Sequence, residues 1–176
     1  GMPLGLHGWI GGSADESEEQ LPFSETIHVP VIVVDSKERM AGQRYNGLVL
    51  PADIGLTMND LIGWQTQPSG SQHARSFGGL FADWQVSPRD RVIIRSPCGD
   101  AVSTPAWHCI KPHEHGAQSQ HLLYAKPDDF FEQSDVSDRC KAVGEELCSV
   151  LSLGEGTNAL SAWMSPLTAA TQTTPE

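Results

Sequence analysis

Two rhythms of apolar and polar positions run through this chain, and each predicts a different kind of element. Residues 29–34 read Val-Pro-Val-Ile-Val-Val, so an extended segment carries apolar side chains on both faces. Strands of that kind are typical of a sheet covered on both sides, and the pattern therefore predicts a buried strand. Pro30 cannot donate a ladder hydrogen bond, which places it near the first residue of that strand.

The middle of the chain predicts a four-stranded antiparallel meander. Four short segments have the composition of strands, namely residues 80–86, 91–96, 101–109 and 119–125. The links at 87–90 and 97–100 contain proline, and the second also contains glycine, which favours tight turns.

A three- and four-residue rhythm near the C-terminus predicts a helix packed on this small sheet. Its apolar positions are Val136, Cys140, Val143, Leu147 and Leu151. Charged residues fill the opposite face, and Gly154 is expected to end the helix. Earlier in the chain, Thr57 and Asp60 form a Thr-x-x-Asp pair that predicts a helix start.

The composition of the two ends sets the expected domain boundaries. Residues 11–20 are rich in Gly, Ser, Asp and Glu, and residues 165–176 in Ser, Thr, Ala and Pro. We therefore expect a flexible acidic segment over 1–20, a single domain over 21–154 and a low-complexity tail over 155–176. A chain of 176 residues with 39% apolar residues can bury one core.

A series of short motifs follows in a fixed order along residues 6–153. They are Phe23-x-Glu25-x-Ile27-x-Val29-Pro30, the segment 48–63, Arg75-Ser76, Pro88-Arg89-Asp90, Thr104-Pro105-Ala106-Trp107, Leu123-Tyr124, Asp128-Asp129 and Glu132-Gln133. In this order they resemble the C-terminal part of a sulfatase of the alkaline phosphatase superfamily. The resemblance implies an α+β fold, with remnant strands of a large sulfatase-type α/β sheet beside a four-stranded antiparallel sheet and its C-terminal helix.

The catalytic portion of such an enzyme has no counterpart in this sequence. Sulfatases hydrolyse sulfate esters with a formylglycine made from Cys or Ser in a Cys/Ser-x-Pro/Ala-x-Arg motif, and a divalent cation, usually calcium, holds the sulfate. None of the four cysteines lies in that context, and the N-terminal Asp-Asp pair of metal ligands is absent. We expect no catalytic residue and no cofactor for this chain alone, with calcium confined to intact family members.

His7 is the one candidate relic of the metal site. Leu6-His7-Gly8 lies where sulfatases carry an Asp-His-Gly motif whose Asp and His face the metal. Leu6 replaces the carboxylate and cannot ligate a hard cation. Glu19 falls where many members carry an active-site lysine, which inverts the charge offered to a sulfate. A second register matches His7 to another histidine of the family, but its spacing fits less well.

Charge and hydropathy exclude several kinds of partner. The net charge of −11 argues against nucleic acid and anionic membrane surfaces, because phosphate binding needs a basic face. No apolar run reaches transmembrane length, and no basic region followed by an apolar core marks a signal peptide. If the chain is complete, we expect a cytoplasmic protein.

Several residues invite a chemical interpretation that the sequence does not favour. A zinc site could be drawn from His108, Cys109, His113, His115 and His121, but Pro112 and Gly116 indicate a polar loop. Cys98 is a weak candidate nucleophile in a tight turn. Cys98 and Cys109 could meet across strands, although reduced thiols are favoured. Core packing is expected for the aromatic residues Trp64, Phe77, Phe81, Trp84 and Trp107.

Two functions stay open. The chain is either a sulfatase-like remnant that acts as a binding or assembly module, or a part of a working sulfatase that joins a catalytic portion encoded elsewhere. In both cases the strand at 29–34 lacks the neighbours that an intact sulfatase sheet provides. We expect residues 27–50 to be covered by the chain's own tails, through Trp9 and Leu160, Trp163 and Met164, or to be buried in a homo-oligomer, of which a dimer is favoured.

Overall fold

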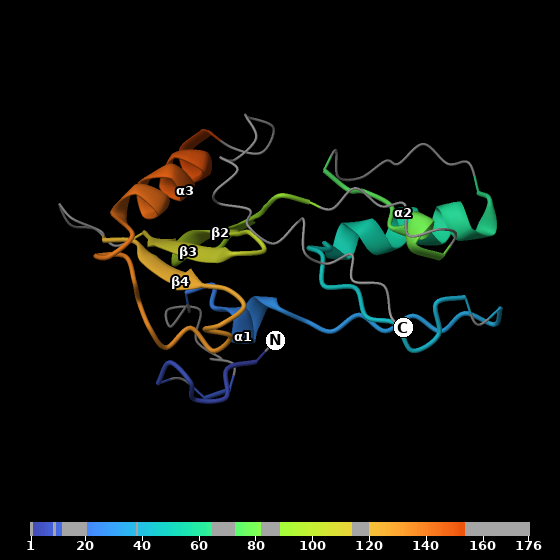
Figure 1. Ribbon diagram of the computed structural model, residues 1–176, viewed down its shortest axis with the longest axis horizontal. Coiled ribbons are helices and arrows are strands. Elements are labelled where there is room, and N and C mark those ends of the chain that lie inside the picture. Colours follow the sequence, from blue (N-terminus) through green and yellow to red (C-terminus); the bar gives the residue numbers. More distant parts are fainter. Residues whose placement is uncertain are drawn as a thin grey trace, which may run out of the picture. The chain divides into compact units, whose positions relative to one another are not determined.

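Figure 1 shows the computed structural model, which describes residues 2–8, 10–11, 21–37, 39–64, 73–81, 89–113 and 120–153. The chain divides into two compact units. The first consists of residues 1–30 and 90–176, and the second of residues 31–89. Each unit is described by itself below. The predicted boundaries at residues 20 and 154 fall next to stretches outside the described residues.

The first unit contains the predicted four-stranded antiparallel sheet. Its strands are β1 (Val92–Arg95), β2 (Gly99–Ser103), β3 (Trp107–Pro112) and β4 (Leu122–Ala125), in the spatial order β1-β2-β3-β4. The helix α3 (Lys141–Leu153) lies over β2 and β3 (Figure 1). A short helix α1 (Ser24–Ile27) precedes the sheet in sequence. The α+β class and the meander packed by a C-terminal helix are confirmed.

Alternation along the strands gives the sheet two apolar faces. The face under α3 buries a cluster made of Val102, Cys109, Leu123, Val143, Leu147, Val150 and Leu151. The opposite face buries Ala101, Ile110 and Tyr124 against Leu21 and Phe23. Residues 101 and 102, or 109 and 110, therefore point to opposite sides, as the period of a strand requires. The helix covers one of these faces and the segment before α1 covers the other.

Two predicted elements in this unit have wrong boundaries. The predicted strand at 101–109 is two strands, because the chain turns at Thr104, whose amide donates to the Trp107 carbonyl over 2.8 Å. The Thr104 hydroxyl also accepts the Trp107 amide at 2.9 Å, a side-chain turn that competes with a ladder. The predicted helix starts at Lys141 rather than near Val136, because the Val136 amide is bound to the Leu123 carbonyl at 2.9 Å.

The second unit is built around α2 (Pro51–Ile62) and a short 3₁₀ helix, η1 (Gly78–Phe81). The predicted helix start at Thr57 is wrong, because α2 begins at Pro51, whose missing amide costs nothing in a first turn. Thr57 lies inside the helix and donates to the Asp53 carbonyl at 2.7 Å. The helix ends at Gly63, which adopts the left-handed conformation with φ of 70°.

Two further expectations fail in the second unit. The predicted strand at 80–86 begins as η1 instead, and residues 82–86, with Trp84, lie outside the described residues. Trp64 was expected in a core but is 64% exposed at the end of α2. Phe77 is buried as expected.

The apolar segment, residues 29–34, is not a buried strand. No strand forms there, and Val29, Val31 and Val33 are 47–49% exposed. Ile32 and Val34 are 86% and 91% exposed. The physical reason is that a strand needs a neighbour, and none of the described strands pairs with this segment. The tails expected to cover it, with Trp9, Leu160, Trp163 and Met164, lie outside the described residues.

Candidate functional site

A cavity in the first unit has a volume of about 240 Å³. Its wall combines five apolar and five polar side chains, contributed by Met2, Leu4, Leu6, His7, Ser24, Glu25, His28, Phe130, Phe131 and Glu132. Three segments meet here: the N-terminal residues, the α1 region and the loop that follows β4. A cavity of this kind is the default candidate for a binding site.

Glu132 is a buried acid that lines this cavity. Its carboxylate is 1% exposed and accepts the Ser24 amide at 2.8 Å as well as the Ser24 hydroxyl. Lys126 Nζ lies 2.8 Å from the same carboxylate. Burial acts to raise the pKa of Glu132, but His108, Lys126 and Ser24 outweigh it and hold that pKa below its ordinary value. The acid is therefore an ionised anchor that ties α1 to the loop after β4.

His108 extends the same network into the sheet. Its Nε2 lies 3.0 Å from the Pro22 carbonyl, so this nitrogen donates, and its Nδ1 accepts the Ser103 hydroxyl at 2.7 Å. Burial lowers the pKa of His108, a shift that the nearby Glu132 carboxylate partly opposes. Both ring nitrogens are thus engaged by the protein's own groups. The network positions the cavity wall rather than offering a free base.

The predicted relic His7 lines this cavity. Its ring stacks on Phe23 with a centroid distance of 3.6 Å and an angle of 6°. Leu6 beside it is 40% exposed. Within the part of the chain that the structure describes, no three His, Cys, Asp or Glu side chains come together in a metal-binding group. Glu19, which falls at a family lysine position, lies outside the described residues.

The residues considered for zinc do not come together in a metal-binding group where the structure describes them. His113 Nδ1 lies 3.2 Å from the Pro97 carbonyl, and its Nε2 lies 3.3 Å from Asp100. His121 Nε2 is buried without a hydrogen-bond partner, against the backbone of Gly144. His108 belongs to the Glu132 network, and Cys109 faces Cys148. His115 lies outside the described residues.

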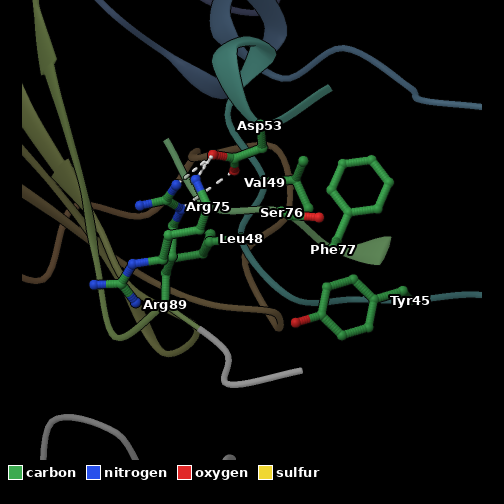
Figure 2. Close-up of a pocket in the computed structure, with 8 residues that line it drawn as sticks. All are labelled: Tyr45, Leu48, Val49, Asp53, Arg75, Ser76, Phe77 and Arg89. Atoms are coloured by element: carbon green, nitrogen blue, oxygen red, sulfur yellow. Dashed lines mark hydrogen bonds and ion pairs between the residues drawn. The ribbon is translucent and has the colours of Figure 1, made fainter. Parts of the chain in front are cut away.

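A second, smaller cavity of about 20 Å³ lies within the second unit. Figure 2 shows the carboxylate of Asp53 facing the guanidinium of Arg89 there, with Tyr45 and Ser76 among the lining residues. Arg89 also donates to the His73 carbonyl at 2.8 Å. The volume suits one water molecule rather than an organic ligand. Arg89 of the Pro-Arg-Asp motif thus forms a buried ion pair with Asp53, and Arg75 of the Arg-Ser motif donates its backbone amide to the same carboxylate.

The comparison with solved structures finds a similarity to part of a sulfatase chain. The structure concerned is a 6S-sulfatase of Bacteroides thetaiotaomicron, described in connection with that bacterium's metabolism of multiple glycosaminoglycans. The TM-score is 0.47 at 16% sequence identity, and the match covers 57% of this chain and 24% of that chain. The match therefore spans about a quarter of that chain's length.

No family model matches the chain. No curated protein matches it either. Among the described residues, no helix is both long and apolar enough to cross a membrane.

Proposed function

We propose that this chain is a sulfatase-related assembly module that hydrolyses no sulfate ester by itself and joins another polypeptide through the apolar segment, residues 29–34. The observation that carries the proposal is the exposure of five branched apolar side chains in this segment, between 47% and 91%. Surface patches of this kind mark interaction sites in proteins that otherwise bury such residues.

The backbone of the apolar segment is as available as its side chains. Among the described residues, none of its amides or carbonyls takes part in a backbone hydrogen bond. An extended, β-branched segment with unpaired backbone groups is suited to pairing with a strand of another chain. Apolar side chains on both faces further favour a position inside a covered sheet.

The occupant that we assign is the same segment of a second copy. Antiparallel pairing of two identical segments places the same surface on both sides of a two-fold axis and closes the assembly. Ten exposed side chains, five from each copy, supply at most roughly 15 kcal/mol of burial energy, the value reached if each contributes about 1.5 kcal/mol. Association costs roughly 4–15 kcal/mol, so a dimer of about micromolar affinity is expected.

Light scattering with size-exclusion chromatography tests this assembly. The chain is measured from about 1 to 100 µM, a range that brackets a micromolar dissociation constant. The expected result is a mass that rises toward two chains with concentration. Ile32→Lys should keep the chain monomeric, whereas Ile62→Lys, which alters an isoleucine that is 61% exposed at the end of α2, should dimerise normally. Equal behaviour of the two variants contradicts the assignment.

The enzymatic half of the proposal has its own assay. The purified chain is expected to give no turnover of a nitrophenyl or nitrocatechol sulfate, with or without calcium, because the sequence lacks the formylglycine motif. Steady turnover that disappears on metal chelation overturns this part of the proposal and leaves the assembly part standing.

A second candidate function rests on the order of the sequence motifs. In intact sulfatases the strand that corresponds to the apolar segment lies in a large mixed sheet, flanked by the N-terminal part. The segment can therefore complete the sheet of a catalytic portion encoded elsewhere, which would make the chain part of a working sulfatase. Co-expression with a sulfatase N-terminal portion decides between the two: a one-to-one complex with sulfatase turnover, lost in Ile32→Lys, favours this function over the homodimer.

A further inference from the structure

Two thiols from distant parts of the chain face each other in the core of the first unit. The Cys109 and Cys148 sulfurs are 3.9 Å apart and share a hydrogen bond. Cys109 lies on β3 and is fully buried, and Cys148 lies on α3 and is half-buried. Residues 39 positions apart in the chain are thus brought into contact by the packing of the helix on the sheet.

Both cysteines are held by well-packed elements. Cys109 sits opposite Val102 on β2 and Leu123 on β4, in the middle strands of the sheet. Cys148 packs against the cluster that contains Leu147 and Leu151. A disulfide has a sulfur–sulfur bond of about 2.05 Å, so the two sulfurs need to approach by roughly 2 Å, which side-chain rotation can supply. Neither element has to unfold for the sulfurs to meet.

The two thiols differ in reactivity. The hydrogen bond from Cys109 lowers the pKa of Cys148 to about 7, a shift that burial opposes and Lys111 assists. The same hydrogen bond, together with burial, raises the pKa of Cys109 well above its ordinary value. Cys148 is also the more accessible of the two. An oxidant from solution therefore meets a partly ionised thiol at Cys148 first.

We propose that Cys109 and Cys148 form a reversible intramolecular disulfide when the protein meets a small-molecule disulfide oxidant. The Cys148 thiolate attacks one sulfur of glutathione disulfide, which forms a mixed disulfide at Cys148 and releases one glutathione thiolate. Cys109 then loses its proton and attacks the Cys148 sulfur, and the second glutathione leaves. The two protein thiols are oxidised by two electrons, and glutathione disulfide is reduced to two glutathione thiols.

The bond would tie α3 to β3 covalently. Cross-linking removes freedom from the unfolded chain, so the oxidised protein should resist denaturation at a higher urea concentration than the reduced protein. A thiol reductant should reverse the shift. The site is thus a modification site through which the redox state sets the stability of the helix on the sheet, independently of the apolar segment.

Native-state oxidation of Cys98→Ser/Cys140→Ser, which retains only the proposed pair, tests the inference. We expect glutathione disulfide to reduce the thiol count from two to zero and the mass by two hydrogens, without bound glutathione. Changing Cys109 to serine in this background should trap glutathione on Cys148, whereas changing Cys148 should leave Cys109 reduced. Two intact thiols after an oxidation that converts a model dithiol contradict the proposal.

Peptide mapping of the oxidised natural sequence keeps the test decisive if a variant fails to fold. The expected cross-linked peptides join the segment around Cys109 to the segment around Cys148, and a reductant separates them. A cross-link between Cys98 and Cys140, or only mixed disulfides with glutathione, overturns the assignment.

Discussion

Replacing Asp53 by asparagine is expected to destabilise the second unit strongly. The Asp53 side chain is almost completely buried and accepts the amides of Leu50 and Arg75, each at 2.7 Å. It also pairs with the guanidinium of Arg89, which is buried beside it (Figure 2). Asparagine keeps one carbonyl oxygen as an acceptor but loses the negative charge. Its NH₂ group is a hydrogen-bond donor, as is the Arg89 guanidinium, so the two groups cannot pair at that position.

The size of the effect follows from what remains buried. Removing one partner of a buried ion pair costs about 3–5 kcal/mol, because the other charge stays in the interior without compensation. The folded fraction of the unit should therefore fall roughly a hundred- to several-thousand-fold relative to the unfolded fraction. The loss of an acceptor for the first turn of α2 acts in the same direction. Replacing Arg89 by methionine in the same variant removes the stranded cation and should recover part of the loss.

Hydrogen exchange in urea measures this cost within the second unit. The amide of Phe77, which donates to the Thr57 hydroxyl at 3.0 Å, reports opening of the contact between η1 and α2. Asp35→Asn is the matched control, because Asp35 pairs with Arg39 at 2.7 Å on the surface, where an ion pair contributes little. Similar protection of the Phe77 amide in Asp53→Asn and Asp35→Asn refutes the assigned role of the buried pair.

Three further predictions concern the first unit. Folding lowers the pKa of His108, so only the unfolded state gains a proton as the pH falls below about 6.5. The free energy of unfolding should therefore drop by up to about 1.4 kcal/mol per pH unit. Urea titrations in which His108→Gln keeps the full slope contradict this prediction. Gly144→Ala should destabilise α3, because the new methyl group clashes with the His121 ring. In a His121→Ala background the same change should increase the stability of the helix by up to about 1 kcal/mol. A double-mutant cycle measured by thermal unfolding tests both outcomes. Elemental analysis of zinc-refilled protein should find no stoichiometric zinc. The prediction is contradicted if the protein binds one zinc per chain and His113→Ala loses it.

The sheet of the first unit could largely be predicted from local patterns. Proline and glycine at 97–100 predict the turn between β1 and β2, and the composition of the flanking segments predicts the strands. The turn after Ser103 was not predicted, because residues 101–109 are compatible with one long strand. It depends on the Thr104 hydroxyl, whose bonds form only when the chain reverses. In α2, Pro51 marks the start of the helix, whereas the Thr-x-x-Asp pair predicts a start at Thr57. The Thr57 hydroxyl instead accepts a hydrogen bond from the Phe77 amide.

The candidate site could be predicted only in part. Glu132 was recognised as part of a motif, but its partner Ser24 is 108 residues away, and no periodicity links the two. The contact between Cys109 and Cys148 could not be predicted for the same reason, because it depends on how α3 packs on the sheet. The apolar segment shows the reverse case. Its pattern indicates a strand, and the segment is exposed because a strand forms only beside a neighbour.

Hydrogen exchange of the amides of residues 31–34 at several protein concentrations tests the assembly proposal most directly. Strand pairing with a second copy should protect these amides progressively as the concentration rises through the micromolar range, by at least about tenfold. The amides of α3, which are bonded within the helix, should not change. Fast exchange at 31–34 that is independent of concentration, in a chain that light scattering shows to be monomeric, contradicts assembly through the apolar segment.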